Sequence, residues 1–314
     1  MTRVAIIGCG LIGRAWAISF LRGGCEVALW DAKTGVCEAV QAALPHAFGD
    51  LRAHGLLEED TDSILSRLHI CDTLQKCVKD AAHVQENTPE VIDNKRAIFA
   101  QLDAAADAET VLASSTSALL PSAIYHGLPG AARCLVAHPI NPPYLVPAVE
   151  IVPGPETSPD VVTRTAEFLT SMGQAPIVMN KEVDGFLMNR LQGALLDEAF
   201  RLVEEGYASA EDVDIGIRDG LALRWAFMGP FETIDLNAPG GVRDYVNRYA
   251  QMYTGVNTAI PTRPDWTGPV LDEIEADRRT RLDAAQLSER QAWRDRRLMA
   301  LIEHKNKANK EFGS

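Results

Sequence analysis

The opening stretch "RVAIIGCGLIG", residues 3–13, most constrains how this chain can fold. It begins with a short, continuous apolar run, which is typical of a strand covered on both faces. Gly8, Gly10 and Gly13 follow in the spacing G-x-G-x-x-G, and residues 11–23 then have a helical pattern. This spacing between a strand and a helix is typical of a dinucleotide-binding turn. The start of the chain therefore predicts a nucleotide-binding α/β fold.

Strand-like and helical segments alternate as far as residue 182. Beyond the first strand, strand-like runs recur at 26–30, 68–71, 83–86, 110–114, 133–137, 149–152 and 175–179. The clearest helical patterns between them lie at 34–54, 91–105 and 159–172. Such alternation is typical of a mainly parallel, doubly wound sheet with helices on both faces. We therefore expect a Rossmann-type NAD-binding domain over residues 1–182.

The strand signal ends there, and the sequence predicts an all-helical second domain over residues 183–314. A long amphipathic segment at 184–206 ends at Gly206, a residue common just past helix ends. The next segment starts at Ser209 with Asp212 three residues later, which is close to a capping box.

Residues 271–311 are rich in charged side chains and have a helical pattern. We interpret this segment as a solvated helix. Its expected packing residues are Leu282, Trp293, Leu298 and Leu301.

Composition excludes several classes of protein. The formal net charge of −13 argues against a nucleic-acid binder, which needs a basic face, and disfavours anionic membrane surfaces. No apolar stretch reaches the roughly 20 residues that cross a bilayer, and the N-terminus lacks the layout of a secretory peptide. The six cysteines form no C-x-x-C pair, which is typical of reduced thiols in a cytoplasmic protein rather than a disulfide frame or zinc site.

The glycine-rich turn sets the expected cofactor contacts. Gly8 allows the tight turn, Gly10 lets the backbone approach a pyrophosphate, and Gly13 lets the helix pack closely. The first helical residues, Leu11 and Ile12, bring unpaired N–H donors to the phosphates. Asp31 ends the second strand, where it would bind a ribose diol and repel a 2′-phosphate, so NAD is favoured over NADP. The alternative role for Asp31 is that of a turn former before "AKTG".

Two further cofactor candidates follow the fourth strand, in "VQENTPEVIDNK". Glu90 and Lys95 could reach the nicotinamide half of the cofactor from the loop and the start of the next helix. Glu90 could equally be a carboxylate that the positive end of a helix dipole stabilises. Spacing alone does not separate these readings.

The candidate reaction site lies at the ends of later strands. "ASSTSALLP" follows a strand, and Ser117 within it could donate to a substrate oxygen, whereas its neighbours suit capping or turns. His138 closes the next strand, and oxidation of an alcohol requires a proton acceptor that titrates near neutrality. Glu150 on an adjacent strand could bond one imidazole nitrogen and stabilise the imidazolium. The alternative is that His138 and Glu150 only satisfy each other inside a core.

Together, these motifs resemble the 3-hydroxyacyl-CoA dehydrogenase superfamily. The resemblance rests on the glycine turn, "SSTS", "HPINPPYLVPAVE" and "GFLMNRL", and it covers nearly the whole chain. Within that superfamily, "QENTPE", "LRWAFMGPFET", "LNAPGG" and "RQAWRD" are most similar to the lambda-crystallin branch. The resemblance implies a catalytic His138 with Glu150 as its partner and substrate-oxygen contacts from Ser117 and Asn189. It also implies NAD bound beside Asp31, Glu90 and Lys95. The helical domain is implied to bind the substrate and to form most of the contact in a homodimer.

The branch implies an NAD-dependent oxidation of a small hydroxy acid, with L-gulonate as the best candidate. Members that act on acyl-CoA carry a short turn where this chain has "LALRWAFMGPFE", which includes Arg224. The stretch 45–67, with "LLEEDTD", is a poor surface for the CoA phosphate. We therefore expect Arg224 and Asn141 to contact a substrate carboxylate or hydroxyl; the alternative for Arg224 is an ion pair with Glu232 or Asp235.

Three alternatives to L-gulonate remain. Carnitine dehydrogenases share the pattern around Arg224, but they place an aspartate where this chain has Asn189 and lack "LNAPGG". A 3-hydroxyacyl-CoA dehydrogenase is the second alternative. The third is a non-enzymatic, crystallin-like NAD-binding protein, against which the presence of Ser117, His138, Glu150 and Asn189 together argues.

Overall fold

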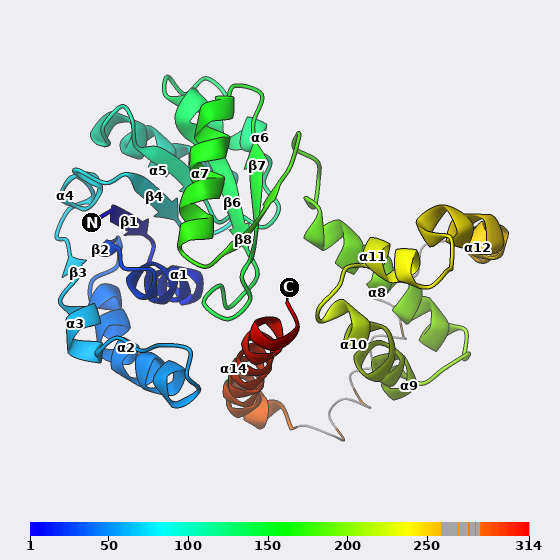
Figure 1. Cartoon of the computed structure of the whole chain (residues 1–314). Helices are drawn as coiled ribbons and strands as arrows, with labels where there is room; N and C mark the ends of the chain where they lie inside the picture. Colours follow the sequence, from blue (N-terminus) through cyan, green and yellow to red (C-terminus); the bar gives the residue numbers. More distant parts are fainter. Residues whose placement is uncertain (259–268, 270–275, 277–279, 281–282, 314) are drawn as a thin grey trace. The chain divides into compact units, whose positions relative to one another are not determined.

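The computed structural model describes residues 1–258, 269, 276, 280 and 283–313 (Figure 1). The chain divides into two compact units. The first comprises Met1–Asn189 together with Trp293–Ser314, and the second comprises Arg190–Ala292. The division expected at residue 182 stays a prediction, and Leu282, one of the expected packing residues, lies outside the described residues.

Eight strands of the first unit form one sheet in the order β3-β2-β1-β4-β5-β6-β7-β8. Neighbouring strands are parallel except β6 and β7, which are antiparallel. The mainly parallel, doubly wound fold is thereby confirmed. The strands are β1 (Arg3–Ile7), β2 (Glu26–Trp30), β3 (Leu68–Ile70), β4 (His83–Glu86), β5 (Val111–Ser114), β6 (Cys134–Pro139), β7 (Ala148–Pro153) and β8 (Ala175–Val178).

Helices cover both faces of this sheet. Those with a predicted counterpart are α1 (Leu11–Arg22), α2 (Val36–Ala53), α5 (Ile92–Ala105) and α7 (Pro159–Ser171). Three five-residue helices were not predicted, because one turn and a half is too short to show a helical period: α3 (Thr61–Leu65), α4 (Leu74–Val78) and α6 (Pro121–Tyr125).

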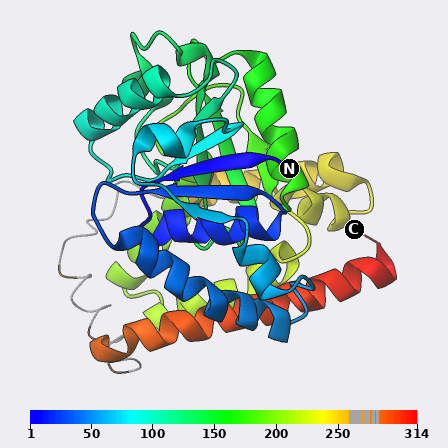
Figure 2. The same ribbon diagram turned by 90° about the vertical axis from the view of Figure 1, so that its left-hand side faces the viewer.

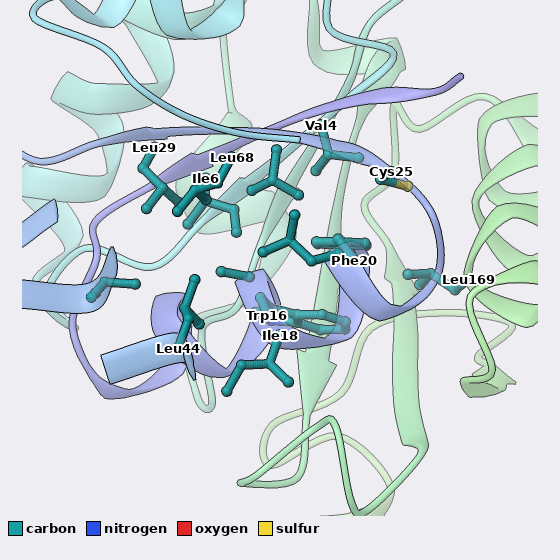
Figure 3. Packing of buried hydrophobic residues seen from close by; sticks show 14 of the residues in the cluster. Val4, Ile6, Trp16, Ile18, Phe20, Cys25, Leu29, Leu44, Leu68 and Leu169 are labelled. Carbon is teal, nitrogen blue, oxygen red and sulfur yellow. The ribbon is translucent and has the colours of Figure 1, made fainter. Parts of the chain in front are cut away.

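The core forms two layers because alternate residues of a strand face opposite sides of the sheet. Val4 and Ile6 of β1 pack with Trp16 and Phe20 of α1 and with α2 and α7 (Figure 3). Ala5 and Ile7 face the other side, where α4, α5 and α6 pack.

The last helix of the chain completes the first of these layers. Part of α14 (Leu287–Phe312) lies on the same side of the sheet as α1 and α2 (Figure 2). Its Met299 is only 3% exposed and joins that core, with Leu298 packed beside it. Trp293 and Leu301 are 42% and 44% exposed, so they are less buried than Met299, and their role as packing residues stays a prediction.

The second unit contains no strand among its described residues. Its helices are α8 (Met188–Glu204), which starts in the first unit, α9 (Ala210–Ile215), a π-helix (Gly216–Leu221), α10 (Ala222–Trp225), α11 (Pro230–Leu236) and α12 (Gly241–Thr258). Ser209 and Asp212 form the expected capping box. The helix expected from residue 184 begins only at Met188, because Gly185 and Phe186 have positive φ angles that a helix does not accommodate.

All six cysteines are free thiols. Five of them are buried, and Cys71 is partly exposed. In the part of the chain that the structure describes, no helix is long and apolar enough to cross a membrane.

His83 of β4 is a fully buried histidine in the centre of the first unit. Its Nε2 lies 2.9 Å from Gln85 Oε1, and its ring lies against Phe20 and Phe168, with centroids 5.9 and 5.3 Å away. Burial lowers the pKa of His83 to about 4, although the hydrogen bond with Gln85 acts in the opposite direction. The folded protein therefore holds this imidazole neutral.

We expect His83 to make folding stability depend on pH. Between pH 6.5 and pH 4 the unfolded chain binds a proton that the folded chain rejects, so stability present above pH 6.5 is lost as the pH falls. The loss reaches about 3 kcal/mol near pH 4. Urea unfolding across this window should therefore show a shallower pH dependence for His83→Gln than for wild type. Equal slopes for the two proteins would contradict this account.

Candidate active site

The candidate site residues of the first unit gather along one edge of the sheet. The carboxyl ends of β1, β2, β4, β5 and β6 lead to Gly8, Asp31, Asn87, Ser115 and His138. The strand order reverses between β1 and β4, which are neighbours in the sheet. Ligands of doubly wound sheets bind in the crevice outside the carboxyl ends at such a reversal.

The three glycines of the turn, which we call the cradle, lie where a Cβ would either clash with neighbouring backbone or face open space. Gly8 has a φ of +85°, and a Cβ on it would lie 2.9 Å from the carbonyl carbon of Asn87. A Cβ on Gly13 would lie 2.0 Å from the carbonyl oxygen of Gly8, so this helix cannot pack here with any larger residue. A Cβ on Gly10 would have no atom within 4 Å, so there is open space beside the Gly10 backbone. No side chain caps the N–H groups at the start of α1, so they remain available to a phosphate.

A cavity of about 820 Å³ adjoins this turn. Its lining includes Gly8, Gly10, Asp31, Asn87 and Asn94. Asp31 is oriented by two backbone donors: the N–H of Cys9 at 2.7 Å and the N–H of Lys33 at 2.8 Å. Its carboxylate thus stands at the cavity wall, as binding of a ribose diol requires. The open cradle, the free helix N–H groups and this carboxylate fit a dinucleotide.

Glu90 and Lys95 lie near each other, but both have partners within the protein. Lys95 is 1% exposed, and its ammonium donates to both carboxylate oxygens of Glu86 at 2.9 Å and to the carbonyl oxygen of Thr88 at 3.0 Å. Glu90 accepts hydrogen bonds from the N–H groups of Ser117 and Ala118. The expected contacts of Glu90 and Lys95 with the nicotinamide half stay predictions.

Glu86 is a buried carboxylate that the sequence analysis did not single out. It accepts from Lys95 and from the hydroxyl of Ser114, 2.6 Å away, and it is fully buried. The available signal was a glutamate at the end of a predicted strand, with a lysine nine residues later at the start of a predicted helix. The network joins the ends of β4 and β5 beneath the loop that carries Ser117.

His138 and Glu150 lie directly opposite each other on β6 and β7. His138 Nδ1 is 2.6 Å from Glu150 Oε2, and His138 is 6% exposed. The other ring nitrogen, Nε2, makes no hydrogen bond with any residue that the structure describes. Because the carboxylate holds the proton on Nδ1, Nε2 keeps its lone pair and can accept a proton.

A tight turn closes over the Glu150 carboxylate. The N–H groups of Leu187 and Met188 donate to Glu150 Oε1 at 2.6 and 2.8 Å, and the buried ring of Phe186 lies 5.6 Å from the His138 ring. Burial raises the pKa of Glu150, but the hydrogen bonds from His138, Met188 and Leu187 together outweigh it, so its pKa lies below the ordinary value. Glu150 is therefore a carboxylate at neutral pH.

Ser117 and Asn189 come together, although 72 residues separate them in the sequence. The side-chain amide of Asn189 donates to the carbonyl oxygen of Ser117 at 2.8 Å. Ser117 is exposed, and its hydroxyl has no partner among the described residues. Asn141, in the loop after β6, has a buried Oδ1 without a hydrogen-bond donor. These three residues offer polar groups that a ligand could satisfy.

Arg224 belongs to α10 of the second unit. Among the described residues it forms no ion pair with Glu232 or Asp235. Asp235 accepts instead from the N–H of Val242 at 2.7 Å. The expectation that Arg224 ties two helices together through such a pair has no support in this unit.

Sequence comparison assigns both parts of the chain to one family. Residues 3–183 match the 3-hydroxyacyl-CoA dehydrogenase NAD-binding domain, and residues 185–278 match the C-terminal domain of the same enzymes. The match to the NAD-binding domain agrees with the cradle and with Asp31, and NAD is the cofactor.

Relatives match over nearly the full chain. Rabbit (Oryctolagus cuniculus) lambda-crystallin is 41% identical over 310 residues, which is 96% of each chain. An L-carnitine dehydrogenase of a Pseudomonas species is 35% identical, over 95% of this chain and 92% of that protein. A solved 5-formyl-3-hydroxy-2-methylpyridine 4-carboxylic acid 5-dehydrogenase has a TM-score of 0.81 at 28% identity, over 96% of this chain and 98% of its own.

Asp31 should make the protein strongly prefer NAD over NADP. A carboxylate opposite a 2′-phosphate places two negative charges at short range. Asp31→Ala should lower the ratio of kcat/KM for NAD to kcat/KM for NADP, without abolishing turnover with NAD. Comparable kcat/KM values for NAD and NADP in the wild type would rule out this role for Asp31.

Removal of the imidazole should slow the reaction while the cofactor still binds. We expect His138→Ala to lower kcat by about 10²–10⁴, the usual contribution of a positioned general base. NADH affinity, followed by fluorescence titration, should stay close to that of the wild type. Glu150→Gln should also lower kcat, because its amide cannot stabilise an imidazolium as a carboxylate does. If His138→Ala keeps most of its activity, His138 is a structural residue.

Proposed function

We propose, from the fact that this chain belongs to the 3-hydroxyacyl-CoA dehydrogenase family, that it oxidises the 3-hydroxyl of a small free hydroxy acid. The protein is an NAD-dependent oxidoreductase that acts on a CH–OH group. The best candidate substrate is L-gulonate, which oxidation converts to 3-dehydro-L-gulonate.

His138 acts as the general base in this proposal. NAD, when bound, supplies the acceptor for the hydrogen and electron pair that leave the carbinol carbon. His138 Nε2 takes the hydroxyl proton, and the Glu150 carboxylate, 2.6 Å from Nδ1, stabilises the imidazolium that results. The Ser117 hydroxyl and the Asn189 amide hold the reacting oxygen, and the unpaired Oδ1 of Asn141 accepts from another hydroxyl of the substrate.

The proposed substrate class rests on which arginines already pair with carboxylates of the protein and which do not. Between residues 45 and 67 the only arginines are Arg52 and Arg67, and each is paired: Arg67 with Glu59, and Arg52 with Asp60 at 3.6 Å. This stretch thus offers no unpaired arginine to the 3′-phosphate of CoA. Arg224 has no acidic partner among the described residues, and a guanidinium matches a carboxylate in two parallel hydrogen bonds.

Two of the similar proteins are named for small carboxylates, whereas the family itself is named for acyl-CoA substrates. L-carnitine, named in one relative, is a 3-hydroxy acid without a CoA group. The dehydrogenase of similar fold is named for a pyridine carboxylic acid. Residues 45–67 and Arg224 are the features of this chain itself that favour such a substrate.

We also propose that the protein is a cytoplasmic homodimer. Six free thiols suit a reducing compartment. The second unit exposes large apolar side chains, among them Phe227, Phe231 and Leu236, each at least two-thirds exposed, and patches of this kind mark interaction surfaces. Light scattering after size-exclusion chromatography should give the mass of a dimer; a monomer would contradict the proposal.

A substrate panel tests the proposed function directly. NADH formation is followed with L-gulonate, L-carnitine and 3-hydroxybutyryl-CoA at equal concentrations of purified protein. We expect kcat/KM to be highest for L-gulonate. A higher kcat/KM for L-carnitine would replace L-gulonate by another small hydroxy acid. A higher kcat/KM for the CoA thioester would overturn the proposed substrate class.

Arg224→Met separates a substrate contact from a structural role. Loss of charge-assisted bonds to the carboxylate should raise KM for the free acid by the equivalent of about 2–4 kcal/mol. The melting temperature and NADH affinity should stay near wild type. Arg248→Met is the matched control, because Arg248 lies in the same unit and pairs with Asp244 at 2.8 Å. A lower melting temperature with an unchanged KM would make Arg224 structural.

A further inference from the structure

A second cavity, of about 520 Å³, lies within the first unit and shares no lining residue with the cofactor cavity. Its wall is built from the end of α1, the loop before β7, the turn after α7 and the face of α14. The residues that matter for its chemistry are Arg22, Gln174, Lys305, Asn306 and Asn309. No part of the proposed reaction uses this cavity.

Two cations of this wall lack an acidic partner. Arg22 donates through Nη1 to the carbonyl oxygen of Tyr144 at 3.1 Å, and neither Arg22 nor Lys305 forms an ion pair with any described residue. Burial lowers the pKa of Arg22, and no carboxylate counteracts it. In a chain with a net charge of −13, two neighbouring cations without a counter-ion leave an unbalanced positive site. A partly buried charge without a partner is costly, and an anion would offset that cost.

The same wall contains an unsatisfied hydrogen-bond acceptor. Gln174 is 8% exposed, and its Nε2 donates to the carbonyl oxygen of Pro143 at 3.2 Å. This bond fixes which end of the amide is the oxygen, since a carbonyl cannot donate. The remaining atom, Oε1, is buried without a donor. A ligand of this cavity must therefore offer a hydrogen-bond donor to Gln174 Oε1 and negative charge to Arg22 and Lys305.

We propose that this cavity binds a small oxyanion that also carries a hydroxyl group. The charge lies against Arg22 and Lys305, the hydroxyl donates to Gln174 Oε1, and the amides of Asn306 and Asn309 bond the remaining oxygens. Inorganic hydrogenphosphate is the simplest member of this class, and the volume also admits a hydroxylated organic anion. Because α14 supplies three of these residues, the ligand joins the end of the chain to α1 and stabilises the first unit.

The test compares phosphate with sulfate on the full chain saturated with NADH, so that the cofactor cradle is filled. Hydrogenphosphate carries a P–OH donor at neutral pH, whereas sulfate carries none. At low millimolar concentration and matched ionic strength, phosphate should raise the melting temperature saturably and more than sulfate, and sodium chloride should not raise it. Calorimetric titration then gives the affinity for phosphate.

Variants assign the effect to this cavity. Lys305→Gln and Arg22→Gln should weaken phosphate binding at least tenfold, and Gln174→Met should remove the preference over sulfate. Lys307→Gln is the matched control, because Lys307 lies on the same helix but is exposed and pairs with Glu303. NADH affinity should be unchanged in all four. Lys305→Gln removes no ion pair or hydrogen bond among the described residues, so wild-type phosphate affinity in this variant would overturn the proposal. Equal effects of the three salts would overturn it too, whatever the substrate panel gives.

Discussion

The antiparallel pairing of β6 with β7 is the constraint on which the candidate site depends. It sets His138 opposite Glu150, and a carboxylate buried between strands must find donors or lose several kcal/mol. One donor is the imidazole, and the other two are backbone N–H groups at Leu187 and Met188. The chain must therefore turn sharply after the sheet, which is why α8 starts where it does and why Asn189 reaches Ser117.

A second buried carboxylate organises the neighbouring strands by the same principle. Glu86 at the end of β4 is satisfied by Lys95 and Ser114, and Glu90 accepts from the loop after β5. Glu86 thus bonds the end of β5, and Glu90 bonds the loop that carries Ser117. Ion pairs and hydrogen bonds within the protein thus connect the strand ends at this edge of the sheet, while the space beside Gly10 is left open.

Much of this fold was predictable because strands covered on both faces are short apolar runs with sharp ends. The sheet, the glycine turn and the pairing of His138 with Glu150 follow from such runs and from the residue at each strand end. The short helices and the partners of Lys95 were not predictable, since they depend on contacts between distant segments. The late start of α8 was not predicted, because Phe186 has a positive φ and phenylalanine rarely adopts one.

The position of Met299 has a consequence for how the protein is made. The first unit takes its core from residues 1–189 and from α14, so the whole of the second unit separates its two parts in the sequence. During translation, the nucleotide-binding sheet leaves the ribosome long before the segment that covers α1 and α2. That face stays uncovered until α14 has been made, so completion of this core waits for a helix that follows the whole of the second unit.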